Sequence, residues 1–279
     1  MQNAAIAALK LNWRYLAFEV PADQLRAAIA GAKAMRFIGL NLTTPHKLAA
    51  LEMVDELDES ARRWGAVNTI RFEVQNQQGQ WHPLGATPQA LPDRIRSHGF
   101  NTDADAITRS LREDLALEPA GARVLLLGAG GGGRTAALKL ASEKAGQLFL
   151  VNRTASKAVA LAEEINDRFP AVAVSVGYPN AKETVDLLVN CTSLGLSPED
   201  LLPLDASWFS LQRAGAVYDM IYRPAETPLL RAARMAGCRV ANGLGMLLYQ
   251  GAKALELWSG RNPPMEVMRE ALRKSVYGS

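Results

Sequence analysis

The sequence predicts an α/β fold in two domains, and three observations support this class. Short apolar runs alternate with amphipathic segments along most of the chain, which is the pattern of strands joined by helical crossovers. One of these runs, 124–127, leads into a glycine-rich turn and then into the apolar segment 136–140, in the order strand, turn, helix. The length of 279 residues is a prior for two domains.

Composition places the chain among ordinary globular proteins. Hydrophobic residues make up 48% and charged residues 21% of the chain, and the net charge is +3. No long basic run argues for nucleic acid, and no apolar run approaches the roughly 20 residues of a membrane span. Cys191 and Cys238 lack metal-ligand spacing, so no metal site is expected. Because no signal peptide is predicted either, we expect a cytoplasmic protein with reduced thiols.

The first 115 residues predict helices and strands in alternation, followed by one long irregular stretch. The periodicity predicts helices over 1–11, 24–35, 51–64 and 104–115, and strands over 15–20, over 37–42 and up to about Val74. Residues 75–97 are rich in Gln, Pro and Gly, and we expect them to form an excursion with little regular structure.

The rest of the chain continues the alternation. Strands are expected over 124–127, 148–151, 172–176, 186–190 and 216–221, with a short one starting at Val240, and helices over 158–168, 231–236, 245–260 and 265–276. In an open α/β sheet the ligand binds at the carboxyl ends of the strands, so the residues that directly follow these strands are candidates for a binding site.

Lys47 follows the strand predicted at 37–42. Thr44 is expected as the N-cap and Pro45 as the first residue of a helix, which places Lys47 in the first turn. A cation at this end opposes the helix dipole. Lys47 is therefore either a solvated side chain or a functional lysine whose ammonium is easier to deprotonate.

Asn68 and Asp103 also have two interpretations each. Asn68 lies in the turn before a strand, as a structural residue or as a hydrogen-bonding group for a ligand. Asp103 precedes the helix 104–115 and is an expected N-cap. A capping carboxylate is held rigidly, which also suits a catalytic or substrate-binding acid.

The glycine turn after Leu127 predicts a dinucleotide site. Gly128, Gly130 and Gly133 have the spacing G-x-G-x-x-G between a strand and a helix. The first glycine permits the tight turn, the second permits close approach of a pyrophosphate, and the third permits close packing of helix on strand. The N–H groups and the dipole of the helix start then favour the phosphate charge.

The residues after the next strand favour NADP over NAD. An NAD site carries an acid for the ribose 2′-hydroxyl about 20 residues after the glycine turn, but Asn152 stands near that place. Arg153, Thr154 and Lys157 offer a cation and further donors that suit a 2′-phosphate. A solvated arginine at a strand end is the alternative interpretation of Arg153.

Taken together, these motifs resemble those of the shikimate dehydrogenase family, which includes the quinate/shikimate dehydrogenases. The resemblance begins near Asn3 and covers nearly the whole chain. Its stretches are Asn-Leu-Thr-Thr-Pro-His-Lys at 41–47, Ala-Val-Asn-Thr at 66–69, Asn-Thr-Asp at 101–103, the glycine turn with Asn-Arg-Thr at 152–154, Asn-Cys-Thr-Ser at 190–193, Tyr-x-Pro at 222–224 and Gln-Gly-Ala at 250–252.

The resemblance implies a fold, an activity and a set of site residues. It implies a substrate-binding domain over 1–104, completed by C-terminal helices in 242–279, and a Rossmann-type NADP-binding domain over 105–241, with a cleft between them. The implied activity is the reversible, NADPH-dependent reduction of 3-dehydroshikimate to shikimate. Lys47 and Asp103 would form the catalytic pair. Substrate would be bound by Thr43, Asn68, Tyr222 and Gln250, and NADP(H) by Gly128, Ala129, Gly130, Gly131, Gly132, Gly133, Asn152, Arg153, Thr154, Lys157, Thr192, Ser193 and Gly243.

Two departures from the family pattern leave alternatives open. The family begins with a strand and a Ser-rich turn that binds the substrate carboxylate, whereas this sequence starts after both. Residues 75–97 are also longer than the short turn that the family usually has between its Asn and Asp motifs. The alternatives are a dehydrogenase for quinate or another cyclitol acid, and an NADP-binding protein without catalysis. In each case we expect small-molecule partners, no nucleic acid and no membrane, and the sequence admits a homodimer.

Overall fold

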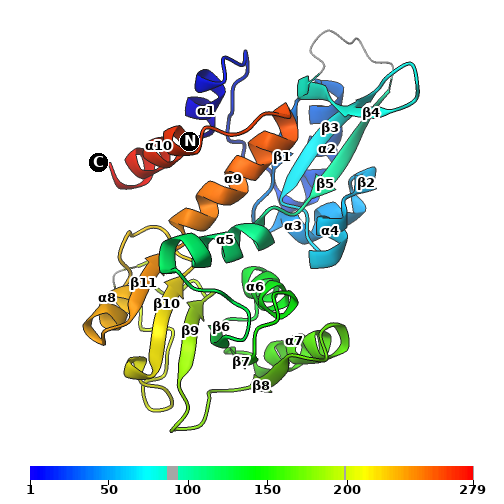
Figure 1. The fold of residues 1–279 in the computed structure, drawn as a ribbon. Coiled ribbons are helices and arrows are strands. Elements are labelled where there is room, and N and C mark those ends of the chain that lie inside the picture. The colour runs from blue at the N-terminus through cyan, green and yellow to red at the C-terminus, as the bar shows by residue number, and fades with distance from the viewer. Residues whose placement is uncertain (87–93, 198, 279) are drawn as a thin grey trace. The chain divides into compact units, whose positions relative to one another are not determined.

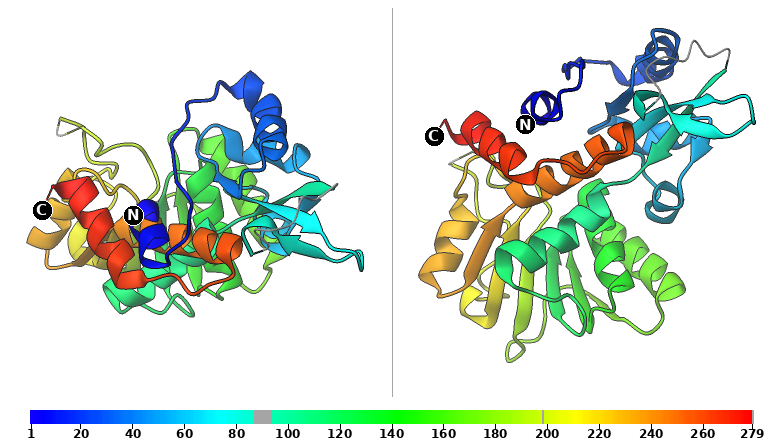
Figure 2. Two further views of the ribbon diagram at one scale, coloured as in Figure 1. Left: turned by 90° about the horizontal axis from the view of Figure 1, so that it is seen from above. Right: turned by 45° about the horizontal axis from the view of Figure 1, so that its top comes forward.

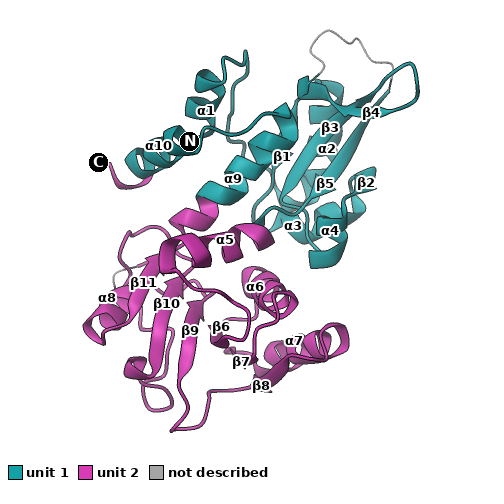
Figure 3. Cartoon of the chain, in the orientation of Figure 1, with its two compact units in different colours: residues 1–103, 248–275, 279 teal, residues 104–247, 276–278 magenta. Residues whose placement is uncertain are grey.

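The chain divides into two compact units, each with its own sheet. The computed structural model describes residues 1–86, 94–197 and 199–278. Unit 1 comprises residues 1–103 and 248–275, and unit 2 comprises residues 104–247 and 276–278 (Figure 3). The first boundary lies one residue before the one expected from sequence. The second lies inside a helix, α9 (Leu244–Ser259), rather than at residue 242.

Unit 1 is built from both ends of the chain. Its elements are α1 (Gln2–Ala8), η1 (Ala22–Gln24), α2 (Leu25–Ala34), β1 (Gly39–Asn41), α3 (His46–Ala49), η2 (Ala50–Glu52), β2 (Glu56–Leu57), α4 (Glu59–Trp64), β3 (Thr69–Gln75), β4 (Trp81–Pro83), η3 (Leu84–Ala86) and β5 (Ile95–Phe100), with most of α9 and of α10 (Met265–Tyr277) (Figure 1).

The sheet of unit 1 is mixed and aligns three strand ends. Its order is β1-β3-β5-β2, with β4 paired to β3. β3 is antiparallel to β1, β4 and β5, while β2 is parallel to β5. Thr69, the first residue of β3, pairs with Asn41 on one side and with Phe100 on the other. The loops that follow β1 and β5 therefore leave the sheet beside the loop that enters β3.

One face of this sheet forms the core of unit 1. Ile70, Phe72 and Val74 alternate along β3 and are buried against Leu25 and Ile29 of α2. Alternation of this kind is what a strand with one buried face requires.

Helix α9 reaches the same sheet from the far end of the sequence. The indole Nε1 of Trp258 donates to the main-chain carbonyl of Ile70 at 2.9 Å. Gly39 of β1 makes room for this ring, because a Cβ there would lie 2.1 Å from Trp258 Nε1. Burial of a tryptophan with its N–H satisfied fixes α9 against β1 and β3.

Unit 2 contains a six-stranded parallel sheet. Its elements are α5 (Asp103–Leu115), β6 (Arg123–Leu127), α6 (Gly131–Ser142), β7 (Gln147–Val151), α7 (Ala155–Arg168), β8 (Ala173–Val176), β9 (Val185–Asn190), η4 (Leu211–Arg213), β10 (Ala214–Asp219), α8 (Pro228–Met235) and β11 (Arg239–Asn242) (Figure 2). The strand order is β11-β10-β9-β6-β7-β8.

The central strands of this sheet are buried on both faces. Leu125 and Leu127 of β6 pack in a cluster with Leu229 and Leu230 of α8. The alternate residues, including Leu126, are equally buried, and α6 and α7 pack against each other and against β6 and β7. The strand order reverses between β6 and β9, which is the switch point where α/β sheets bind ligands.

Three expectations from the sequence are wrong within the described residues. Residues 15–20 pair with no strand, and Leu16 and Phe18 are exposed. The helix expected over 51–64 is divided into η2, β2 and α4, because Glu56 and Leu57 pair with β5 and Asp58 starts a new helix by accepting from Ser60 N–H at 2.9 Å. The stretch 75–97 contains β4, η3 and the start of β5; its residues 87–93 lie outside the described chain.

Candidate functional site

Lys47 and Asp103 form an ion pair at the aligned strand ends of unit 1. Lys47 Nζ lies 2.8 Å from Asp103 Oδ2, and their side chains are 31% and 11% exposed. Lys47 stands in α3 after β1, and Asp103 is the first residue of α5 after β5. The pairing of β1 and β5 with the two sides of β3 brings together residues that are 56 positions apart.

The local helix at Lys47 differs from the expected one. Pro45 rather than Thr44 is the N-cap residue, no side chain caps the helix, and α3 has only four residues. A single turn has few aligned peptide dipoles, so the helix-dipole argument for Lys47 is weak here. The group that acts on its ammonium is the Asp103 carboxylate.

Asn101 holds Asp103 in place. Its Oδ1 accepts from Asp103 N–H at 3.1 Å, and its Nδ2 donates to the carbonyl of Ala66 at 3.1 Å. Asn101 is buried, and it links the start of α5 to the loop that precedes β3. Asp103 is the first residue of α5 and not the expected N-cap residue before the helix, and from this position it forms the ion pair with Lys47.

Asn68 is buried in a hydrogen-bond network with Thr102. Its Oδ1 accepts from Thr102 N–H at 2.9 Å, and its Nδ2 lies 3.0 Å from Thr102 Oγ1. Thr102 Oγ1 also lies 3.2 Å from the main-chain carbonyl of Gln250, so the network reaches α9. Thr102 was missed by the sequence analysis, although it lies in the Asn-Thr-Asp motif beside Asp103.

The other predicted substrate residues divide between the units. Thr43 is exposed in the loop after β1, and its hydroxyl makes no hydrogen bond within the described part of the chain. Gln250 lies in the unit 1 part of α9. Tyr222 lies in unit 2, in the loop after β10, with 39% of its surface exposed and its main-chain carbonyl accepting from Tyr277.

The glycine turn of unit 2 has the geometry that a pyrophosphate requires. Gly128 has φ +102°, which favours glycine, and a Cβ on Gly133 would lie 1.9 Å from the Gly128 carbonyl oxygen. A Cβ on Gly130 or on Gly131 would meet nothing within 4 Å. Helix α6 begins here with no acidic residue and no side-chain cap in its first turn. Its N–H groups thus remain for an anion, and the turn fits a dinucleotide.

Ala129 and Gly132 complete this turn. Asn152 Oδ1 accepts from Ala129 N–H at 2.9 Å, so Asn152 ties the end of β7 to the glycine turn. Arg153, Thr154 and Lys157 are exposed beyond it. Within the described residues, the guanidinium of Arg153 makes no ion pair or hydrogen bond, which leaves it available to an anionic group.

Asn190 and Asp219 fix the loop that carries Thr192 and Ser193. Asn190 Oδ1 accepts from the N–H and the hydroxyl of Thr192 at 3.0 and 2.8 Å. Asn190 Nδ2 donates to Asp219 Oδ1 at 3.0 Å, and Thr227 Oγ1 donates to Asp219 Oδ2 at 2.6 Å. Burial raises the pKa of Asp219 above its ordinary value, although these hydrogen bonds oppose the rise. Neither Asn190 nor Asp219 was predicted as a site residue.

The remaining predicted residues of unit 2 lie at the same sheet edge. Ser193 is exposed in the loop after β9. Gly243 follows β11, and a Cβ there would lie 2.1 Å from the Met220 carbonyl, so this position has no room for a side chain. The glycine turn contacts the neighbouring loop directly, since a Cβ on Gly128 would lie 3.0 Å from Thr192 Cγ2.

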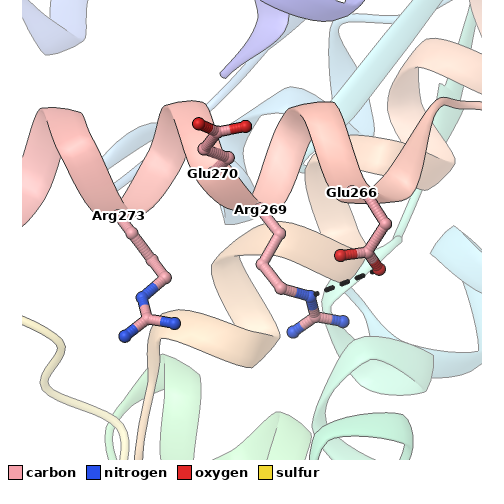
Figure 4. Close-up of a pocket in the computed structure, with 4 residues that line it drawn as sticks. All are labelled: Glu266, Arg269, Glu270 and Arg273. Carbon is pink, nitrogen blue, oxygen red and sulfur yellow. Dashed lines mark ion pairs between the residues drawn. The ribbon is translucent and has the colours of Figure 1, made fainter.

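A separate pocket lies on α10 and contains none of the predicted site residues. It is lined by Glu266, Arg269, Glu270 and Arg273, and Glu266 pairs with Arg269 at 3.9 Å (Figure 4). Acids and bases from one helix share this surface. No group of three His, Cys, Asp or Glu side chains in the described chain is placed to hold a metal ion, and no described helix has the length and hydropathy of a membrane span.

These features define a class of protein. A parallel sheet with a glycine turn after β6, at its switch point, makes unit 2 a Rossmann-type nucleotide-binding fold. Three family profiles then match the chain: the shikimate dehydrogenase substrate binding domain over residues 1–70, shikimate / quinate 5-dehydrogenase over 111–196, and the shikimate 5′-dehydrogenase C-terminal domain over 243–273. The chain belongs to the shikimate dehydrogenase family.

Individual relatives are similar over almost the whole chain. The shikimate dehydrogenase (NADP(+)) of Moorella thermoacetica is 43% identical, and the match spans 100% of this chain and 89% of that protein. A crystal structure of a shikimate dehydrogenase in complex with NADP+ superposes with a TM-score of 0.82 at 32% identity, over 99% of this chain and 89% of that one. A 5-ketofructose reductase of Gluconobacter superposes with a TM-score of 0.78 at 33% identity, over 98% and 91% of the two chains.

Proposed function

We propose that this protein is an NADP-dependent shikimate dehydrogenase that reversibly reduces 3-dehydroshikimate to shikimate. The observation that carries the proposal is the Lys47–Asp103 ion pair at 2.8 Å, held beside the polar side chains of Asn68 and Thr102. The family membership and the glycine turn of unit 2 support the same conclusion. The proposed activity is that of the Moorella relative, a shikimate dehydrogenase (NADP(+)).

Lys47 and Asp103 would act on the substrate oxygen. NADPH, when bound, supplies a hydride for the carbonyl carbon. The ammonium of Lys47 would donate a hydrogen bond to the ketone oxygen and then its proton, so that an alcohol forms without a free alkoxide. Asp103 Oδ2 would orient Lys47 Nζ through the ion pair. Because 31% of the Lys47 side chain is exposed, solvent can return the proton after each turnover.

The residues of unit 2 would bind NADP(H). The open space at Gly130 and Gly131 and the uncapped start of α6 suit the pyrophosphate. Arg153, with Thr154 and Lys157, suits the 2′-phosphate, since a guanidinium binds phosphate oxygens in a bidentate manner. Thr43, Asn68, Gln250 and Tyr222 would hydrogen-bond the hydroxyls and the carboxylate of the substrate.

A four-way assay tests substrate and cofactor together. The wild-type protein is supplied with shikimate or quinate, each with NADP+ or NAD+, and initial rates give kcat/KM. We expect the highest kcat/KM with shikimate and NADP+. A higher kcat/KM with quinate and NAD+ would replace the proposal by the quinate alternative, which the shikimate / quinate profile keeps relevant.

The second alternative, an NADP-binding protein without catalysis, predicts a different result in the same assay. A protein that binds NADPH but turns over no cyclitol acid would be a nucleotide-binding protein without catalysis. Titration of NADPH fluorescence against the protein measures that binding independently of turnover. We also propose a cytoplasmic location and a homodimer, and sedimentation equilibrium tests the homodimer.

A further inference from the structure

A continuous chain of hydrogen bonds runs through unit 1 from Tyr15 to α9. Tyr15 Oη donates to Asn41 Oδ1 at 3.0 Å, and Asn41 Nδ2 donates to Thr69 Oγ1 at 3.0 Å. Thr69 Oγ1 then donates to Asn68 Oδ1 at 3.1 Å. The last links are those of Asn68 with Thr102, and of Thr102 with the Gln250 carbonyl.

The donors and acceptors of this hydrogen-bond network can be assigned consistently. The main-chain N–H of Thr102 can only donate, so its contact with Asn68 at 2.9 Å identifies the accepting oxygen of that amide. Asn68 Nδ2 must then donate to Thr102 Oγ1, whose own proton faces two groups that can only accept, the Gln250 carbonyl at 3.2 Å and Asn68 Oδ1 at 3.3 Å. At the other end, burial raises the pKa of Tyr15, so its hydroxyl stays protonated and donates.

Because Asn68 is buried, the assignment of its amide oxygen as acceptor and its amide nitrogen as donor has energetic consequences. Asn68 and Thr69 are 2% and 0% exposed, so water cannot replace a lost partner cheaply. Asn68 Oδ1 already accepts from Thr102 N–H and from the Thr69 hydroxyl, while its amide nitrogen has two protons and, within the described residues, one side-chain acceptor, Thr102 Oγ1. Asn68 therefore has a donor, and not an acceptor, to spare.

We propose that Tyr15, Asn41 and Thr69 are positioning residues that fix Asn68 as a hydrogen-bond donor toward the substrate. This inference rests on the proposed function. It implies that the substrate group opposite Asn68 presents an oxygen lone pair, as a hydroxyl or carboxylate does. Thr102, which precedes Asp103, would transmit the same alignment to the Lys47–Asp103 pair.

Thr69→Val is the central test. Valine keeps the shape of threonine but removes the hydroxyl, which leaves Asn68 Oδ1 and Asn41 Nδ2 without this partner. We expect the KM for shikimate to rise about tenfold, as the loss of one buried hydrogen bond of about 1.4 kcal/mol would give, with the KM for NADP+ unchanged and a smaller change in kcat. Thr69→Ser restores the hydroxyl and should return the KM to within about threefold of wild type.

Control variants separate positioning from folding. Thr108→Val removes the hydroxyl of a buried threonine, which donates to the Asp105 carbonyl outside the network. Tyr178→Phe removes the hydroxyl of a half-buried tyrosine, which accepts from Asp205 N–H. Neither substitution should change the KM for shikimate. Tyr15→Phe acts three hydrogen bonds away from Asn68 and should raise the KM for shikimate only a few-fold. Should Thr69→Val fail to fold, Tyr15→Phe carries the test at a less buried position.

A double-mutant cycle decides whether Thr69 acts through Asn68. In an Asn68→Ala background, Thr69→Val should have no further effect on the KM for shikimate. Full additivity of the two changes, or equal effects of Thr69→Val on shikimate and on NADP+, would overturn the inference.

A crystal structure of Thr69→Val gives a readout without turnover. The Asn68 amide should rotate or lose order, and an unmoved amide would overturn the inference. If wild type oxidises no cyclitol acid, the proposed function fails, but this structural readout still decides the orientation of Asn68. If wild type oxidises shikimate and all the variants match it, only the positioning role fails.

Discussion

Lys47 and Glu73 illustrate two uses of a charged residue in unit 1. Lys47 has one carboxylate partner and partial access to solvent, which lets it exchange a proton. Glu73 is 1% exposed on the second face of β3 and is surrounded by Arg71, Arg96 and His98. Its charge is neutralised inside the protein and is not accessible to a ligand, so Glu73 has a structural role.

Lys47→Ala tests the catalytic role directly. Removal of a general acid lowers rates by about 10²- to 10⁴-fold, and we expect kcat to fall by that amount. The affinity for NADPH should stay within about twofold, because Lys47 belongs to unit 1 and the glycine turn to unit 2. Fluorescence titration measures the affinity. Lys253→Ala, at an exposed position of α9, is the control, and a kcat equal to wild type in Lys47→Ala would contradict the assignment.

Arg153→Ala tests cofactor choice. Loss of a charge-assisted bond to phosphate costs about 1.5 to 3 kcal/mol, so the KM for NADPH should rise at least tenfold. The KM for NADH should change little, since NADH has no 2′-phosphate. Arg231→Ala removes an exposed cation from α8 and should affect neither cofactor. Equal losses for NADPH and NADH in Arg153→Ala would remove the argument for NADP.

The lowered pKa of Glu73 leads us to predict a loss of folding stability at acidic pH. Its neighbours His98, Arg96 and Arg71 lower its pKa from 4.5 to about 2, in spite of burial. A lowered carboxyl pKa adds stability above pH 4.5, and this stability is lost as the pH falls through about 2. A shift of this size corresponds to about 3 kcal/mol at neutral pH.

Glu73→Gln should therefore be less stable than wild type by about that amount at pH 7, and the difference should shrink between pH 4.5 and 2. Urea unfolding at several pH values measures it. Glu270→Gln, on the exposed side of α10, should follow wild type throughout. If the free energies of unfolding of Glu73→Gln and wild type differ by the same amount at every pH, then Glu73 contributes through packing and not through its charge.

At the scale of elements, the turn between β6 and α6 contains one glycine that is needed for packing and another that we expect to be needed for binding. Gly133 packs against the Gly128 carbonyl, with no space for a Cβ, whereas Gly131 has open space around it. Gly133→Ala should therefore push α6 away from β6 and lower both stability and NADPH affinity. Gly131→Ala should keep the stability and lose affinity, because its methyl group would occupy the space proposed for the pyrophosphate.

Thermal unfolding and NADPH titration measure the two effects. Gly31→Ala in α2 is the matched control: nothing lies within 4 Å of its Cβ, so the substitution should stabilise the helix by about 0.5 to 1 kcal/mol without any effect on NADPH. Equal NADPH affinity in Gly131→Ala and wild type would place the pyrophosphate elsewhere.

The sequence predicted the elements of unit 2 better than those of unit 1. Parallel strands buried on both faces read as continuous apolar runs, and all six strands of unit 2 lie close to their predicted positions. Unit 1 is a mixed sheet with short strands, some of two or three residues. Local periodicity cannot identify such strands, since their pairing is fixed by residues far along the chain.

The candidate site was predictable in part for the same reason. Lys47 and Asp103 were found from motifs, and the strand register explains their proximity. The hydrogen bonds that connect Tyr15, Asn41 and Thr69 were not predicted, because Asn41 contacts Thr69 only through the pairing of β1 with β3. Asp219 was missed because its partners Asn190 and Thr227 become neighbours only in the folded sheet.

At the scale of the whole molecule, unit 1 depends on residues near both ends of the chain. Trp258 of α9 bonds to Ile70, and Gln2 of α1 donates to the Gly251 carbonyl at 2.8 Å. Trp258→Ala should cost about 3 to 5 kcal/mol, the usual cost of emptying a buried aromatic site. Trp208→Ala, at a position 67% exposed, should cost less than about 0.5 kcal/mol. Guanidinium unfolding compares them, and similar losses would contradict the role of α9.

The discontinuity of unit 1 also has a consequence for biosynthesis. Nascent chains leave the ribosome amino end first, and domains usually acquire structure in that order. Here the first 103 residues lack Trp258 until α9 has been synthesised, whereas the stretch 104–247, which is all of unit 2 except residues 276–278, is synthesised without interruption. During translation, the nucleotide-binding unit should therefore fold before the unit that contains Lys47. This order of folding is the reverse of the order in which the two units begin in the sequence.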